Sequence, residues 1–412
     1  MSRFSSHRMA NLAALYTLAV MLPFVHFYTY QTTVGRLPFV SGVIPVLTLV
    51  GFLPLLWFSA RSTLPPSRIG VSAFFLLLYL MVHVLVMHSG GSIIGRDVDG
   101  ELFSNNMLII YKALIFLLVG INLRDPFVFR SLVLAVWGVL SVSAFANIGA
   151  GSLFLDLDDA AEGMAGLYLF LGDSYAIWAL LAVLCARGFP LKLALIAVSL
   201  LSLFILTSRT SLYAFIVAEV CVLGVILARE PRLLFHRLLL ILFVLVGGAI
   251  LLLSVVGVDE ILQGRMFRLF SEGQDDSWSF RQWQLDMGIE HIKESPIFGN
   301  YGSQVLLLGR MGDYIHSYLE VWRQFGIVPF LWIVFLAGAA LLMAYRSAAR
   351  EGTDRDLFVL SIAIFTCLEI STARSWGNSY IFIAIGMCSG ALFSSSRRKV
   401  HLLSKRSLGG GL

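Results

Sequence analysis

The sequence predicts an all-α, polytopic membrane protein with about twelve transmembrane helices. Only 13% of its residues are charged, compared with about 25% in a soluble domain. Hydrophobic residues make up 58% of the chain, and the mean hydropathy is +0.84. Apolar stretches of about 17–25 residues, enough to cross a bilayer, recur along the chain. This composition excludes an ordinary soluble domain, and no clustered basic and aromatic surface suggests nucleic-acid binding.

The predicted transmembrane segments follow one another with short connectors for most of the chain. Their centres lie at about residues 18, 50, 79, 114, 140, 177, 200, 220, 247, 336, 364 and 386. The first begins with basic residues, "MSRFSSHRMANLAALYTLAVMLPFVHF", as a signal peptide does. Because it lacks a small-x-small cleavage site, we expect an uncleaved first span.

Lysine and arginine are distributed unevenly between the two sets of connectors. About nineteen lie in the set that includes the C-terminal tail and about ten in the other set, six of these in one long loop. This bias predicts both termini in the cytoplasm and the long loop outside. The expected organisation is nine spans in 1–257, a periplasmic cap in 258–326, three spans in 327–394 and a basic tail in 395–412.

The long loop contains two predicted amphipathic helices. In "DSWSFRQWQLDMGIEHIKESP", Ser277 or Ser279 can cap the first helix and Pro296 ends it. Its expected apolar edge comprises Trp283, Met287 and Ile292. The second is expected from about Asp313, with one apolar edge and one polar edge. The apolar edge comprises Ile315, Tyr318, Leu319 and Trp322, and the polar edge comprises His316, Glu320 and Arg323.

Three basic residues on the outer side can carry chemistry. Arg209 lies in the tight turn "TSRTS", where it either snorkels to lipid phosphate or binds an anion. Arg281 lies at the start of the first loop helix, whose dipole favours an anion. His316 is either a solvated loop histidine or a group able to accept a proton from a hydroxyl. Guanidinium groups bind phosphate oxygens, so the three together suit a lipid-linked diphosphate attacked by a sugar hydroxyl.

This region resembles the signature region of the O-antigen ligase and O-antigen polymerase superfamily. The matching residues are Arg281 with Trp283, then Pro296, Gly299 and Gly302, then His316, Leu319 and Gly326, and upstream the Ser-Arg turn at Arg209. The chain departs from the family pattern in three places. The tryptophan follows the arginine by two residues instead of four, Ser317 replaces an asparagine, and the glycine spacing differs by one.

The resemblance implies a glycosyltransferase on the periplasmic face of the bacterial inner membrane, using undecaprenyl-diphosphate-linked glycan as donor. Arg209 and Arg281 would then hold the diphosphate, and His316 would activate the acceptor or contact the donor. Neither a metal nor another cofactor is implied. Trp278, Trp283 and Trp322 are expected to stack on sugars, and Glu320 and Arg323 are also expected to bind substrate. Glu320 could alternatively orient the His316 imidazole, act as a base, or pair with Arg323 at the surface.

Three functions remain open from the sequence. A polymerase would use another lipid-linked repeat unit as acceptor, and a ligase would use the lipid A core. A polymerase is favoured because polymerases diverge more in these motifs, and it could work with a chain-length regulator. Lys112, Glu219 and Glu369 lie within predicted spans, where ionisable groups are costly, and they are the main argument for a lipid-linked glycan or ion transporter.

Two other groups of residues carry weaker expectations. The cysteines lie in apolar runs without CxxC spacing, so we expect small packed side chains and neither disulfides nor zinc ligands. They are Cys185, Cys221, Cys367 and Cys388. The outer-loop acids in "GRDVDGE" and "LDLDDAAEG" could hold a divalent metal, but solvated loops or glycan contacts explain them more simply.

Overall fold

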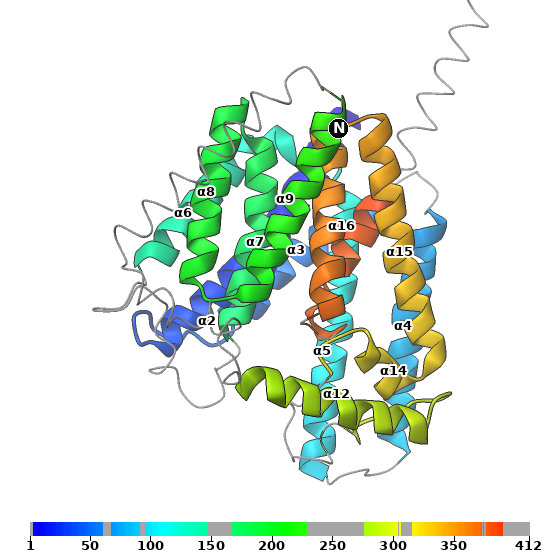
Figure 1. Ribbon diagram of the computed structural model, residues 1–412. Coiled ribbons are helices and arrows are strands. Elements are labelled where there is room, and N and C mark those ends of the chain that lie inside the picture. The colour runs from blue at the N-terminus through cyan, green and yellow to red at the C-terminus, as the bar shows by residue number, and fades with distance from the viewer. Residues whose placement is uncertain are drawn as a thin grey trace, which may run out of the picture.

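The computed structural model describes residues 3–60, 67–90, 96–146, 167–229, 276–303, 305, 315–372, 374 and 376–389. In these parts of the chain every regular element is a helix, which confirms the predicted all-α class (Figure 1). The first half contains α1 (Arg3–Ala19), η1 (Val20–Phe24), α2 (Val25–Thr33), α3 (Val43–Ala60), α4 (Arg68–Ser89), α5 (Arg96–Asn122), η2 (Pro126–Phe129), α6 (Arg130–Ala146) and α7 (Leu167–Cys185). These are followed by α8 (Phe189–Ile205), α9 (Arg209–Arg229), α12 (Asp276–Glu294), α14 (Leu319–Phe325), α15 (Ile327–Arg350), α16 (Asp354–Thr372) and η5 (Trp376–Asn378), and residues 381–389 are also helical.

Eight helical segments of the described chain are long and apolar enough to cross a membrane. The first, His7–Thr33, combines α1, η1 and α2, and α8 is a shorter apolar helix. Eleven of the twelve predicted centres fall in helices. The centre near residue 247 lies outside the described residues, so the count of about twelve spans stays a prediction.

Helix α7 occupies the interior of the bundle. All of its residues from Leu171 to Cys185 are buried, and it packs against α6, α8, α9 and α16. A helix that is apolar on all sides is expected in such an interior position. Asp173 is the exception in this apolar sequence, because its fully buried carboxyl group requires polar partners.

Helix α12 lies across one end of the bundle (Figure 1), where it contacts α14. The helix itself confirms the first predicted loop helix. Its buried stripe runs through Gln284, Gly288 and Ile292 at a spacing of four residues. Trp283 is 38% exposed, so it lies beside this buried stripe and not within it. Part of the predicted cap, residues 258–275, and the basic tail lie outside the described residues.

The second loop helix, α14, is shorter than the sequence predicts. It begins at Leu319, and His316 and Ser317 form a bend before it. The Glu320 carboxylate accepts the Ile315 backbone N–H at 2.9 Å, and Ser317 Oγ accepts the Leu319 N–H at 3.2 Å. Side chains that bond to nearby backbone in this way compete with helical hydrogen bonds. His316 therefore does not share a helical face with Glu320.

The turn after α12 packs directly against the junction between α14 and α15. The Pro296 carbonyl accepts Trp322 Nε1–H at 2.8 Å and the Ile327 backbone N–H at 3.2 Å. Gly299 and Gly326 have φ values of +79° and +86°, which favour glycine. The glycines of this motif thus join the end of α12 to the start of a membrane-spanning helix.

Candidate functional site

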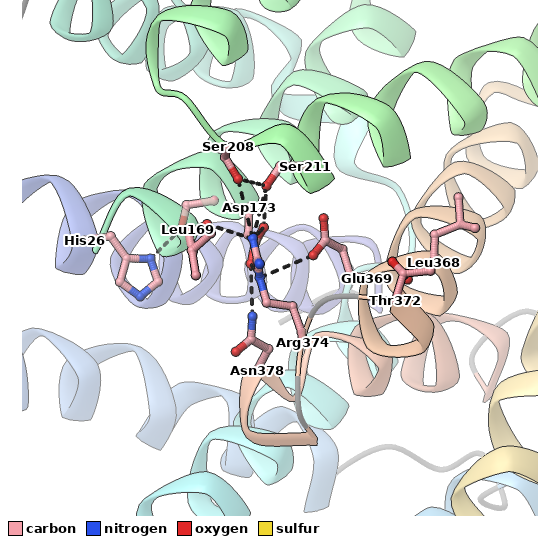
Figure 2. Close-up of polar contacts among 11 residues, drawn as sticks. His26, Leu169, Asp173, Ser208, Ser211, Leu368, Glu369, Thr372, Arg374 and Asn378 are labelled. Carbon is pink, nitrogen blue, oxygen red and sulfur yellow. Dashed lines mark hydrogen bonds and ion pairs between the residues drawn. The ribbon is translucent and has the colours of Figure 1, made fainter. Parts of the chain in front are cut away.

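A buried ion pair joins α7 to the segment after α16. Arg374 Nε and Nη2 donate to Asp173 Oδ2 and Oδ1, each at 2.8 Å (Figure 2). Arg374 is 1% exposed and Asp173 is 0% exposed. Asn378 Nδ2 donates to Asp173 Oδ2 at 3.0 Å. A bidentate pair with a further amide donor is the geometry that can offset the desolvation of two buried charges.

Glu369 adds a second carboxylate to this network. Its Oε2 lies 3.3 Å from Arg374 Nε, and its backbone carbonyl accepts the Arg374 N–H at 2.8 Å. Glu369 is 2% exposed, and its side-chain oxygens accept no hydrogen bond within the described structure. Two carboxylates around one guanidinium favour further positive charge close by.

The network includes the α8–α9 turn that carries Arg209. Ser211 Oγ donates to Asp173 Oδ1 at 2.5 Å, and Ser208 Oγ lies 2.6 Å from Ser211 Oγ. Both hydroxyl groups lie 3.5 Å from Arg374 Nη2 (Figure 2). Arg209, between these serines, is the first residue of α9 and is partly exposed. The positive N-terminal end of α9 therefore lies close to the Arg374 guanidinium.

Backbone strain accompanies the same network. Thr207 and Ser379 are the positive-φ residues other than glycine in the described chain, both at +56°. Thr207 precedes Ser208, and Ser379 follows Asn378. Such conformations cost about 1–3 kcal/mol and persist where the surrounding contacts fix them. The hydrogen bonds of the network supply that constraint on both segments.

Arg281 lies on α12 and approaches the network from the end of the bundle. Its charge acts on the Glu369 carboxylate together with those of Asp173 and Arg374. The Arg281 side chain is half-buried. Arg209 and Arg281 are 72 residues apart in the sequence. Both are associated with the same buried charged groups, those of Asp173, Glu369 and Arg374.

His316 belongs to a chain segment that contacts both α12 and α16. Its neighbour Ile315 packs against Gly288, two helical turns after Arg281. Tyr318 interacts through its hydroxyl with Cys367 and Ser371, on either side of Glu369. Burial and the Cys367 thiol raise the Tyr318 pKa well above its usual value. The Arg209 turn thus lies against Arg374, just after α16, and the Arg281 charge acts on Glu369 near the end of α16. The segment of His316 contacts the same part of α16 through Tyr318.

The other expected substrate-binding residues have different surroundings. Trp283 stacks on Phe280, with ring centroids 5.5 Å apart, and both rings are exposed. Trp322 stacks on Phe330 at 5.0 Å. Glu320 and Arg323 form a buried pair, and Trp278 lies in α12 with its side chain outside the described set. The exposed pair Phe280–Trp283 flanks Arg281 along the helix.

Sequence reasoning missed Asp173 and Arg374. The signal for Asp173 was an aspartate in the apolar run "LYLFLGDSYAIWALL", since an intramembrane carboxylate needs a partner. Glu219 is buried with Oε1 lacking a partner within the described structure, and the charge of Lys112 acts on His26. The described residues contain no cluster of three potential metal ligands. The acids of "LDLDDAAEG" lie outside the described residues.

One known protein family is similar to the region of the chain that contains these segments. No curated protein matches the chain. The O-antigen ligase family model matches residues 194–334, about a third of the chain. The matched region contains Arg209, Arg281 and His316 and extends from α8 into α15. The match confirms the resemblance seen in the sequence motifs: residues 194–334 are similar to the O-antigen ligase family.

Proposed function

We propose that this protein polymerises surface-polysaccharide repeat units, using undecaprenyl-diphosphate-linked glycan as donor and another lipid-linked repeat unit as acceptor. The observation that carries the proposal is the convergence of the Arg209, Arg281 and His316 segments on the C-terminal end of α16 and Arg374, which follows it. All three residues lie within the region matched by the O-antigen ligase family. The ligase reaction needs the same donor chemistry and differs in its acceptor, the lipid A core.

In the proposed reaction, an acceptor hydroxyl oxygen attacks the anomeric carbon of the donor. The new glycosidic C–O bond forms as the bond from that carbon to the diphosphate oxygen breaks, and the diphosphate leaves with the electron pair. Arg209 and Arg281 stabilise the negative charge that develops on the diphosphate. His316 accepts the proton from the hydroxyl. Holding the two substrates in line supplies much of the rate enhancement.

The donor glycan is proposed to extend along α12 from the diphosphate site. Phe280 and Trp283 form an exposed stacked pair on either side of Arg281 in the sequence. Aromatic faces of this kind present apolar surface against which a sugar ring can pack. The polyprenyl chain would lie among membrane-spanning helices, where the surrounding side chains are apolar.

We place the reaction on the periplasmic face of the inner membrane with both termini in the cytoplasm. The lysine and arginine bias of the connectors supports this orientation. In Figure 1, α12 and the N-terminus lie at opposite ends of the bundle, as this orientation requires. A chain-length regulator is proposed as a further partner at the periplasmic side.

The proposed enzymatic activity is tested by incubating the purified protein in detergent with donor and acceptor. No ion gradient is present under these conditions. Glycan lengthening, retained in the presence of EDTA, is expected. Arg281→Ala and His316→Ala should abolish it and leave membrane insertion intact. Absence of turnover in detergent together with transport in vesicles would support the transporter alternative instead.

A deletion strain separates the two acceptors. Loss of a polymerase leaves lipid A core carrying a single repeat unit, because ligation continues. Loss of a ligase leaves core without any repeat unit. Core without repeat units would contradict the polymerase proposal and favour the ligase.

A further inference from the structure

We infer that Asp173 and Arg374 are positioning residues that hold Arg209 in place at the diphosphate site. The inference rests on the proposed function for what Arg209 binds, but the two positioning residues come from the structure. Neither belongs to the motifs that carry the family resemblance, and Asp173 and Arg374 both lie outside the matched region 194–334.

The pair itself is a fixed support. Asp173 comes from α7, the most buried of the membrane-spanning helices that the structure describes, and Arg374 comes from the segment between α16 and η5. Two hydrogen bonds of 2.8 Å fix the relative orientation of the two planar groups. With exposed fractions of 0% and 1%, the groups cannot exchange partners with water. A movement of one segment would therefore have to move the other or break the pair.

The support is connected to Arg209 through the two serines beside it. Ser211 donates to Asp173 Oδ1 and Ser208 is hydrogen-bonded to Ser211, so the residue before α9 and a residue of its first turn are both held against α7. Gly172 allows the close contact, because a Cβ at that position would lie 2.3 Å from Ser208 Cβ. The positive φ of Thr207 shows that the turn adopts a conformation that its own residues disfavour. Tertiary contacts with Asp173 therefore determine where Arg209 begins α9.

Charge gives Arg374 a second role. Arg374, Asn378 and Ser211 together occupy both oxygens of Asp173. Without Arg374, an uncompensated carboxylate would lie one hydrogen-bonded serine away from the Arg209 turn. That negative charge would repel a diphosphate and attract the Arg209 guanidinium. Arg374 thus keeps the carboxylate as a structural acceptor for the turn.

The test measures binding of undecaprenyl diphosphate to the purified full-length protein in detergent. The main variant is Asp173→Asn with Arg374→Gln, which removes both charges of the bidentate pair together and so leaves neither of these two groups as a lone buried ion. It should weaken binding about tenfold to a hundredfold, the size of effect seen when outer residues that orient a binding group are removed. In a background of Arg209→Ala it should weaken binding no further, because its effect passes through Arg209.

Two more variants guard against an effect of folding alone. Ser211→Ala removes one connection without leaving a charge, and it should weaken binding only when Arg209 is present. Tyr175→Phe is the matched control, because it removes a buried 2.8 Å hydrogen bond to Ser141 from the same helix. Thermal unfolding midpoints are measured for every variant. Tyr175→Phe should lower the midpoint and leave binding unchanged.

The outcomes separate this inference from the proposed function. If the paired variant or Ser211→Ala weakens binding equally with and without Arg209, or not at all, the positioning role is wrong and the proposed function stands. If the wild type fails to bind undecaprenyl diphosphate, or Arg209→Ala binds as well as the wild type, both fall. Loss of binding that depends on Arg209 supports the inference.

Discussion

Arg323 and Glu320 form a buried ion pair within α14, with Arg323 Nη2 2.8 Å from Glu320 Oε2. Their exposed fractions are 2% and 1%, although helical periodicity predicts a polar edge there. The carboxylate also accepts hydrogen bonds from Gln324 Nε2 and the Ile315 backbone N–H. Glu320 thereby ties the start of α14 to the bend that contains His316. Its role as a substrate-binding residue stays a prediction, and its contacts stabilise the bend.

Glu320→Gln should destabilise the protein strongly. Breaking a buried pair by removing one charge typically costs about 3–5 kcal/mol. Glu290→Gln is the matched control, because its 2.8 Å pair with Lys293 is 60% exposed at the glutamate and worth about 0–1 kcal/mol. Thermal unfolding midpoints in detergent measure both changes. Equal midpoints for the two variants would show that the buried pair contributes nothing.

The stability of the protein should depend on His291 at mildly acidic pH. Burial and the charge of Arg323 lower the His291 pKa below its usual 6.5. The unfolded chain therefore binds a proton at a pH where the folded protein does not. Stability is complete above about pH 6.5 and falls as the pH decreases through that value.

The measurement compares wild type with His291→Gln, which cannot titrate. Unfolding midpoints are recorded at about pH 7.5 and pH 5.5, on either side of the usual histidine pKa. The wild type should lose more stability than the variant between these values. A variant with the same pH dependence as the wild type would assign the effect to other groups.

Gly326→Ala should prevent the close packing between the α12 turn and α15. A Cβ at this position would lie 2.0 Å from the Ile297 carbonyl oxygen, and φ is +86°. The strained backbone alone costs about 1–3 kcal/mol, and the steric overlap adds to it. Gly338→Ala in α15 is the control, because a Cβ there meets no atom within 4 Å. Monodisperse yield in detergent should fall for the first variant only.

Gly120→Ala should weaken the contact between α5 and the helix at residues 381–389. The added Cβ would lie 2.3 Å from the Ile383 carbonyl oxygen and 2.8 Å from Gly386 Cα. Small residues at membrane-helix contacts allow this close approach of the backbones. Gly138→Ala in α6, with open space around it, should leave the unfolding midpoint unchanged. A similar effect of both variants would contradict the specific contact.

Arg281→Lys should reduce glycan transfer about tenfold to a hundredfold if Arg281 binds the diphosphate. Lysine keeps the positive charge but cannot bind two phosphate oxygens with one planar group. Lys293→Gln, on an exposed position of the same helix, is the control and should retain normal transfer. Initial rates at saturating and limiting donor concentration separate weaker binding from slower chemistry. Full activity of Arg281→Lys would exclude bidentate binding.

The sequence alone determined the features that depend on local pattern. The length of each apolar run predicts a helix, and α12 follows from its cap, its periodicity and Pro296. The motif glycines could also be recognised, since Gly299 and Gly326 have backbone conformations that favour this residue. The side of α12 that is buried could not be predicted, because Trp283 suits either an apolar contact or an exposed surface.

Only the tertiary structure decided which polar groups meet. Asp173 and Arg374 are 201 residues apart in the chain, and no periodicity relates them. Whether the Glu320 and Arg323 side chains point to solvent or to each other depends on α12 and the bend at His316 closing over them. A buried charge is stable only with a partner, so the sequence could show that Asp173 needs one. The packing of α7, α9 and α16 supplied Arg374 and, through the same contacts, fixed the turn that carries Arg209.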